Sequence, residues 1–274
     1  MIKRIFTIGL ISVFSACNSG DKPAEETPVN NLPAPQPITF SIDAVLPHDS
    51  SAFTQGLQFY DGKLYEGTGQ YEESTLRIVE PKTGKVEKKY LIPDTTIFGE
   101  GITIFKNKIY QLTWQSHKIF VYNLNDITHP IKTLNWFSEG WGITNDGNSL
   151  IISDGITDKI YYALPDEEKN EMHVIKTLSV ADNTGPLDRI NELEFIDGSI
   201  YANLWQTNYI LKIDTANGHV TGKMDLTGLL AQYDAKEMTN QTDVLNGIAY
   251  DSTTKKLYIT GKRWPKMFVM TLNK

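Results

Sequence analysis

The sequence predicts an all-β fold, a five-bladed β-propeller whose ring is closed by an N-terminal strand. Three observations predict it. A hairpin pattern of two short apolar runs around a polar turn occurs five times between residues 56 and 264. Aromatic residues, which favour strands, make up 11% of the chain. The sequence stops after the third strand of the last repeat, one strand short of a complete unit.

The first 37 residues have the composition of a targeting segment followed by a tether. Lys3 and Arg4 precede a short apolar run and two small residues before Cys17, the single cysteine of the sequence. This order is typical of a bacterial lipoprotein signal peptide, residues 1–16, with Cys17 as the acylated residue; an ordinary secretory signal is the alternative. Proline-rich polar sequence makes 17–37 an extended tether. We therefore expect lipid anchoring in a bacterial cell envelope, on either its periplasmic or its surface face.

The five repeats begin at residues 56, 101, 142, 192 and 247, which are 45, 41, 50 and 55 residues apart. Four of them contain a turn pair that favours hairpins: Asp61-Gly62, Lys106-Asn107, Asp146-Gly147 and Asp197-Gly198. A third strand follows at Lys118 and at Tyr209. A repeat of this length holds about four strands, which is one propeller blade. A β-sandwich is the alternative, but sandwiches do not repeat an internal unit in this way.

The segment 38–46 alternates apolar and polar residues, so we predict that it supplies the missing outer strand of the last blade and removes an open edge. The propeller domain is accordingly 38–274. The longer spacings indicate insertions at 164–189 and 225–242, the second with a short helix within 226–238.

Composition and missing motifs exclude several functions. The net charge of −7 argues against a nucleic-acid partner, which requires a basic surface. The sequence has no HExxH, Cys/His metal pattern, GxSxG or Walker loop. The histidines are scattered and are interpreted as surface residues: His48, His117, His129, His173 and His219. We expect a monomer.

Equivalent positions of the repeats become neighbours in a propeller, because the first strand of each blade lines the central channel. The residues just before the first strands are Gln55, Glu100, Trp141, Asn191 and Asn246. Those at the ends of the second strands are Gly69, Trp114, Asp154, Trp205 and Lys262. Singly, such residues pack or cap turns, and Asp154 fits either a turn or the channel. Together, apolar walls with few polar groups are typical of a small-ligand pocket.

Eight ordered motifs carry a resemblance to a known family: FTQGL (53–57), FGEGIT (98–103), QLTW (111–114), GWGIT (140–144), SDG (153–155), NELEFIDGSIYANLW (191–205), LNGIAYD (245–251) and TGKRWP (260–265). From about residue 40 onward the chain resembles the glutamine cyclotransferase family, the plant and bacterial type of glutaminyl-peptide cyclotransferase. The resemblance implies a five-bladed propeller that needs no cofactor, with room for a structural calcium ion in the central channel. The segment 67–77 departs from the family pattern at Tyr71-Glu72-Glu73, which affects the pocket rim.

The resemblance also implies the site and its chemistry. The site residues are Phe53, Gln55, Phe98, Glu100, Trp114, Trp141, Asn191, Trp205 and Lys262. The reaction is an acyl transfer in which the α-amine of an N-terminal glutamine, on a peptide or protein, attacks its own carboxamide and releases ammonia. Glu100 is expected to shuttle the proton, whereas Gln55, Asn191 and Lys262 donate hydrogen bonds to the oxyanion. The five aromatic residues form the substrate-binding walls.

Two other functions stay open at this stage. A non-catalytic propeller lipoprotein that binds a ligand or partner would keep the aromatic pocket without needing Glu100. A propeller lactonase is a weaker alternative, because it needs a metal held by several channel carboxylates and the predicted ring offers only Glu100.

Overall fold

The computed structural model describes residues 31–234 and 236–273. The predicted signal peptide, Cys17 and most of the predicted tether lie outside the described residues. The described chain is all-β, as predicted, and its one helix is α1 (Leu229–Asp234), within the second predicted insertion. In this part of the chain no helix has the length and apolarity needed to cross a membrane.

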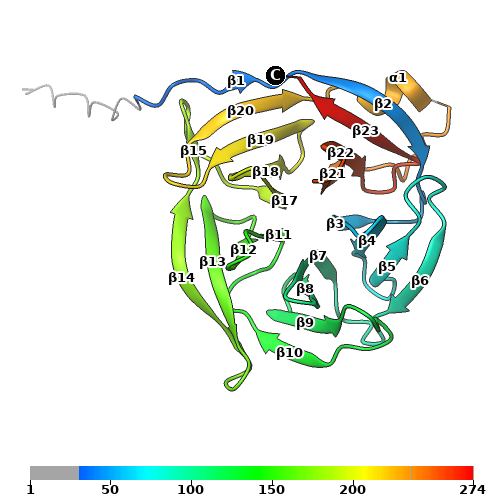
Figure 1. Cartoon of the computed structure of the whole chain (residues 1–274), viewed down its shortest axis with the longest axis vertical. Coiled ribbons are helices and arrows are strands. Elements are labelled where there is room, and N and C mark those ends of the chain that lie inside the picture. The colour runs from blue at the N-terminus through cyan, green and yellow to red at the C-terminus, as the bar shows by residue number, and fades with distance from the viewer. Residues whose placement is uncertain (1–30, 235, 274) are drawn as a thin grey trace, which may run out of the picture. The chain divides into compact units, whose positions relative to one another are not determined.

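Twenty of the 23 described strands form five groups of four antiparallel neighbours (Figure 1). The first group is β3 (Thr54–Tyr60), β4 (Lys63–Thr68), β5 (Thr75–Val79) and β6 (Val86–Leu91), and the second is β7 (Gly99–Phe105), β8 (Lys108–Thr113), β9 (Lys118–Asn123) and β10 (Lys132–Asn135). The third is β11 (Ile143–Asn145), β12 (Leu150–Ser153), β13 (Lys159–Asp166) and β14 (Glu171–Ser179). The fourth is β17 (Ile190–Ile196), β18 (Ser199–Leu204), β19 (Tyr209–Asp214) and β20 (Val220–Asp225). The fifth is β21 (Leu245–Asp251), β22 (Lys256–Gly261), β23 (Lys266–Leu272) and β2 (Phe40–Pro47).

Figure 1 shows these groups arranged around a central axis, with the first strand of each group nearest the axis. Neighbouring innermost strands contact one another, and β21 contacts β3, so the sheets nearly close into a barrel-like ring. The second and third groups are also joined at their outer edge by a parallel pair, Asn135 with Glu171. A small two-stranded sheet of β15 (Ala181–Asp182) and β16 (Gly185–Pro186) lies in the first predicted insertion.

The hairpin turns explain why the first two strands of a group pair as they do. Both residues of the turns at Asp61-Gly62, Lys106-Asn107 and Asp197-Gly198 have positive φ, between 46° and 83°. Such turns match the right-handed twist of the flanking strands, and glycine, asparagine and aspartate tolerate this conformation best.

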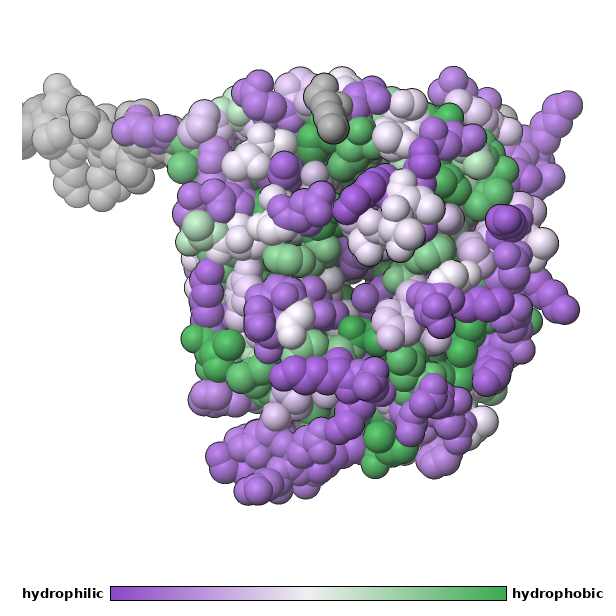
Figure 2. Space-filling view, in the orientation of Figure 1, coloured by the Kyte–Doolittle hydropathy of each residue, from purple (hydrophilic) through white to green (hydrophobic). Residues whose placement is uncertain are grey.

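The hydrophobic core is divided among the interfaces between neighbouring groups. Five clusters of buried side chains each combine residues of two adjacent groups, such as Ile210 with Phe268 between the fourth and fifth. Fully burying one such side chain stabilises the fold by about 1.5–3 kcal/mol. Hydrophilic side chains form most of the outline of the face seen in Figure 2, with hydrophobic side chains in smaller patches between them.

Two N-terminal segments pair with strands from late in the sequence. β2 runs antiparallel to β23, from Phe40 beside Leu272 to Pro47 beside Lys266. The short strand β1 (Gln36–Pro37), at the end of the predicted tether, runs parallel to β20. Both pairings cover what would otherwise be exposed sheet edges.

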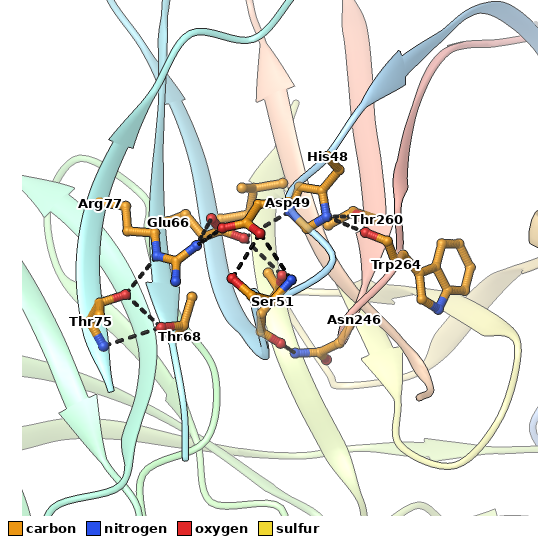
Figure 3. Close-up of polar contacts among 12 residues, drawn as sticks. His48, Asp49, Ser51, Glu66, Thr68, Thr75, Arg77, Asn246, Thr260 and Trp264 are labelled. Carbon is orange, nitrogen blue, oxygen red and sulfur yellow. Dashed lines mark hydrogen bonds and ion pairs between the residues drawn. The ribbon is translucent and has the colours of Figure 1, made fainter. Parts of the chain in front are cut away.

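The prediction that His48 is a surface residue is wrong. His48 is buried at the seam between the first and fifth groups, where its Nδ1 lies 2.6 Å from the Trp264 carbonyl oxygen and its Nε2 lies 3.0 Å from Glu66 Oε1 (Figure 3). A carbonyl and a carboxylate only accept hydrogen bonds, so these two contacts favour the ring with a proton on each nitrogen. Glu66 Oε1 also accepts from Thr54 Oγ1 at 2.8 Å. The position of His48 after β2, outside the repeats, gave no signal for this contact.

Candidate active site

One cavity of about 390 Å³ opens where the inner strands of several groups begin. All nine residues that the family resemblance implies line it: Phe53, Gln55, Phe98, Glu100, Trp114, Trp141, Asn191, Trp205 and Lys262. The polar members are almost fully buried, whereas the aromatic members are partly exposed. The cavity therefore has a polar floor and aromatic walls.

Bulges in the inner strands bring the floor residues together. The strand register shifts between Thr54 and Gly56 and between Gly99 and Ile102, the positions that flank Gln55 and Glu100. Similar shifts flank Asn191 and Asn246. A bulge re-aims a side chain without ending the strand. Each of these four bulges thus carries a polar side chain, and the bulge between Ile190 and Leu193 carries two, Asn191 and Glu192.

Close backbone packing explains the glycines that follow several of these positions. A Cβ at Gly142 would lie 2.0 Å from the Asn191 carbonyl oxygen, so only glycine fits there. The fourth repeat has Glu192 instead, and its carboxylate accepts from the backbone N–H groups of Leu57 at 3.2 Å and Ile248 at 2.9 Å. The Glu192 side chain thus links three inner strands, β17, β3 and β21.

The floor holds a carboxyl group, Glu100, and an amine, Lys262, and burial shifts the pKa of both. Burial raises the pKa of Glu100 well above its usual range; Lys262 opposes this shift, and Glu139 adds to it. Burial lowers the pKa of Lys262, against the attraction of Glu100. Such mutually perturbed groups in a cleft are typical of catalytic sites.

Two amides complete the floor. Gln55 Nε2 donates to Glu100 Oε1 at 3.2 Å, and Asn246 Nδ2 lies 3.4 Å from Gln55 Oε1, which orients the Gln55 amide. The buried Oδ1 of Asn191 has no hydrogen-bond partner among the described residues. A buried acceptor without a partner is costly, and an N–H of a bound ligand would satisfy it.

The aromatic walls are held by edge-to-face contacts. Phe98 stands between Phe53 and Trp114, with ring centroids 6.1 and 5.7 Å away, and Trp141 meets Trp205 at 5.2 Å. Lys262 Nζ lies 4.9 Å from the centroid of the Phe53 ring. Each aromatic pair contributes about 0.5–1.5 kcal/mol beyond its burial.

Three repeat-equivalent residues do not line this cavity: Asn246, Gly69 and Asp154. Asp154 caps the turn that follows β12, since its Oδ1 accepts from the backbone N–H and hydroxyl of Thr157 at 3.0 and 2.9 Å. Four lining residues were missed by the sequence analysis: Gln70, Gln206, Asp243 and Val244. Gln70 and Gln206 share one repeat position, directly after Gly69 and Trp205, so the repeat alignment did carry a signal for them. Asp243 and Val244 lie in the long connection before the fifth repeat, where no alignment applies.

Glu100 is the only carboxylate at the repeat positions predicted to begin the inner strands, but it is not the only buried carboxyl group on those strands. Glu192 and Glu194 of β17 are also buried, and burial raises the pKa of Glu194 to about 8. Calcium takes six to eight oxygen ligands. Within residues 31–234 and 236–273 no group of three or more His, Cys, Asp or Glu side chains lies close enough to hold a metal ion. These side chains alone do not fit a calcium site, and structural calcium stays a prediction.

Comparison with known proteins shows consistent similarities. A sequence model of the glutamine cyclotransferase family matches residues 11–272. The glutaminyl-peptide cyclotransferase of Arabidopsis thaliana is 37% identical over 232 residues, which cover 84% of this chain and 70% of that protein. The crystal structure of Myxococcus xanthus glutaminyl cyclase is similar with a TM-score of 0.77 and 30% identity, over 87% of this chain and 98% of that chain.

Proposed function

This chain belongs to the glutamine cyclotransferase family, and we propose that it converts N-terminal glutamine of peptides or proteins to pyroglutamate with Glu100 as the proton shuttle. The observation that carries the role of Glu100 is its position. Its carboxyl group is buried on the floor of the aromatic cavity, in contact with Gln55. The shared family and the similarity to two cyclases do not favour the non-catalytic binding module.

The first step is attack of the neutral α-amine on the carbon of the side-chain amide. A C–N bond forms, the amide oxygen becomes an oxyanion, and the amine proton passes to the Glu100 carboxylate. A free α-amine has a pKa of about 7.7–8.0, so a carboxylate with a raised pKa accepts its proton more readily than an ordinary one.

The second step breaks the original C–N bond. Glu100 returns the proton to the departing nitrogen, ammonia leaves and the carbonyl of the five-membered ring re-forms. Lys262 and the amide N–H groups of Gln55 and Asn191 donate to the oxyanion; one such donor contributes about 10²–10³-fold in rate. The free Oδ1 of Asn191 accepts from the substrate amine.

The aromatic walls select the reactive conformation of the substrate. The reaction is already intramolecular, so the protein gains by holding the glutamine side chain folded back on its own amine. Trp114, Trp141 and Trp205 surround the space above the polar floor and exclude water.

The test is ammonia release from Gln-initiated dipeptides by the full chain and by Glu100→Gln. We expect turnover by the parent and a loss of about 10²–10⁴-fold in the variant. Glu87→Gln, on the exposed outer strand β6, serves as the control and should match the parent. A folded parent that releases no ammonia from several such peptides would overturn the activity; an active Glu100→Gln would overturn the shuttle.

We also propose that the five strand groups are the blades of a propeller and that β2 closes the ring. The support is the equal strand number of the groups and the antiparallel pairing of β2 with β23. Deletion of residues 1–47 should then expose β23 as an edge and yield aggregating protein.

We further propose that the protein is a monomeric lipoprotein of a bacterial cell envelope, acylated at Cys17. The order of basic, apolar and small residues before this cysteine supports the anchor. Mass spectrometry of the expressed chain should find a lipid on Cys17 that Cys17→Ser lacks, and an unmodified Cys17 would contradict the proposal.

A further inference from the structure

Glu139 joins two walls of the cavity. It lies between β10 and β11, and its Oε2 accepts from Trp114 Nε1 at 2.7 Å and from Trp141 Nε1 at 3.0 Å. Trp114 follows β8, whereas Trp141 precedes β11. One carboxylate oxygen therefore sets the position of two indoles that belong to different strand groups.

The segment around Glu139 is itself held in place. The Glu139 carbonyl accepts from Trp136 Nε1 at 3.0 Å, so residue 139 receives the N–H groups of three of the five tryptophans. A Cβ on Gly140 would stand 3.0 Å from Leu112 Cβ, which shows how closely the backbone lies against β8. On its outer side, Glu139 Oε1 accepts from Gln115 Nε2 at 3.3 Å.

The effect of this contact extends along the whole wall. Trp114 supports Phe98, and Trp141 supports Trp205. Without Glu139 the two indole N–H groups would lose their acceptor, and both pairs could turn away from the substrate. A hydrogen bond to a charged carboxylate is about twice as strong as one between neutral groups. Glu139 therefore holds the two indoles more firmly than a neutral acceptor would.

We propose that Glu139 is a positioning residue of the cyclisation site, which fixes the Trp114 and Trp141 indoles with its carboxylate. The proposal rests on the cyclotransferase function proposed above. The acceptor and the charge are separable, because a carboxamide keeps an acceptor oxygen and loses the charge.

The charge of Glu139 acts on the floor of the site. Burial raises the pKa of Glu100 most, Lys262 lowers it, and Glu139 raises it further. Near Glu139, Ser138 contacts both His117, at 2.7 Å, and Asp154, at 3.4 Å, whereas Gln115 is uncharged. Removing the negative charge of Glu139 should lower the pKa of Glu100.

The experiment compares Glu139→Ala, Glu139→Gln and the control Glu87→Ala, on the exposed outer strand β6, in the full chain. We measure kcat and KM across pH and record tryptophan emission without substrate. We expect Glu139→Ala to raise KM and to lose up to about 100-fold in kcat/KM, with shifted emission. Glu139→Gln should recover the KM and emission of the parent, while the acidic limb of its kcat/KM profile moves to lower pH. Glu87→Ala should match the parent in all three readouts.

Parent-like KM and emission in Glu139→Ala would overturn the positioning role. An acidic limb in Glu139→Gln that coincides with that of the parent would overturn the charge effect. Emission needs no turnover, so a shift in Glu139→Ala that Glu139→Gln reverses supports the positioning role even if the parent releases no ammonia. In that case the proposed function would be wrong, but the role of Glu139 in positioning Trp114 and Trp141 would still be supported.

Discussion

The indole of Trp141 lies directly on Gly155. A Cβ at position 155 would stand 2.0 Å from Trp141 Cδ2, and the φ of Gly155 is +66°. The glycine thus leaves space for a ring of the cavity wall, and it also adopts a backbone conformation that other residues rarely do.

Substitution of Gly155 should weaken substrate binding as well as cost the free energy of placing another residue in this backbone conformation. In Gly155→Ala the methyl group displaces Trp141, so KM rises and the melting temperature falls. Gly62→Ala is the matched control, because Gly62 has a φ of +74° with nothing within 4 Å of its added Cβ. Both variants should lose the roughly 1–2 kcal/mol of the left-handed conformation. Equal KM values for the two variants would show that Trp141 tolerates the methyl group.

Removal of the Lys262 charge should shift the pH profile as well as the rate. Lys262 opposes the effect of burial on Glu100, so Lys262→Met should raise the pKa of Glu100 further and move the acidic limb of kcat/KM to higher pH. The loss of an oxyanion donor should lower kcat by about 10²–10³-fold. Steady-state kinetics from pH 5 to 9 measure both effects. A limb that moves to lower pH would contradict this charge arrangement.

The His48–Glu66 pair should make stability depend on pH. Burial alone would lower the pKa of His48, but Glu66 and the Trp264 carbonyl outweigh it and raise the pKa above 6.5. Burial alone would raise the pKa of Glu66, but His48 and Arg77 outweigh it and lower the pKa below 4.5. The His48 contribution is complete below pH 6.5 and is lost as pH rises through the folded pKa. The Glu66 contribution is present above pH 4.5 and is lost as pH falls.

The pair should therefore contribute most between pH 4.5 and 6.5. Removing one partner of a buried ion pair costs about 3–5 kcal/mol. His48→Gln should lower the melting temperature most in this window and less at pH 9, with His129→Gln, at an exposed position, as the control. A melting difference that does not vary with pH would mean that His48 is neutral in the fold.

Glu194 should oppose stability at high pH. Its pKa is raised to about 8 by burial, although its Oε1 accepts from the Tyr250 N–H at 2.9 Å. The protonated form of Glu194 contributes its full stabilisation below pH 4.5, the ordinary pKa of glutamate. This contribution is lost as the pH rises through about 8. The slope is at most about 1.4 kcal/mol per pH unit. Chemical denaturation of Glu194→Gln should show a flatter dependence between pH 5 and 8 than the parent.

Sequence reasoning succeeded where the repeats constrain the structure. Gln55, Glu100 and Asn191 occupy equivalent positions in different repeats, and the cavity brings them together. The repeat position of a residue predicts where the residue lies along its strand, but not what its side chain contacts. Asp154 shares its repeat position with Trp114 and Lys262, yet its oxygens are taken by Thr157.

The rest of the site could not be predicted from the repeats. Glu139 lies in a connection between groups, where the lengths of the chain vary and no alignment applies. His48 precedes the first repeat, and its partners Glu66 and Trp264 are far from it in sequence. Such contacts depend on how the sheets pack, and neither periodicity nor composition reports that packing.

The pairing of β2 with β23 places the N-terminal strand of the fifth group beside the last described strand. The Asn273 N–H donates to the Thr39 carbonyl oxygen at 2.9 Å, and Ser41 Oγ donates to Asn273 Oδ1 at 2.9 Å. A circularly permuted chain, with residue 273 linked to residue 39 and new ends at the exposed Thr95 between the first and second groups, would keep the strand pairs of all five groups. A permuted chain that folds would show that the strand pairs, and not the position of the chain ends, determine this fold.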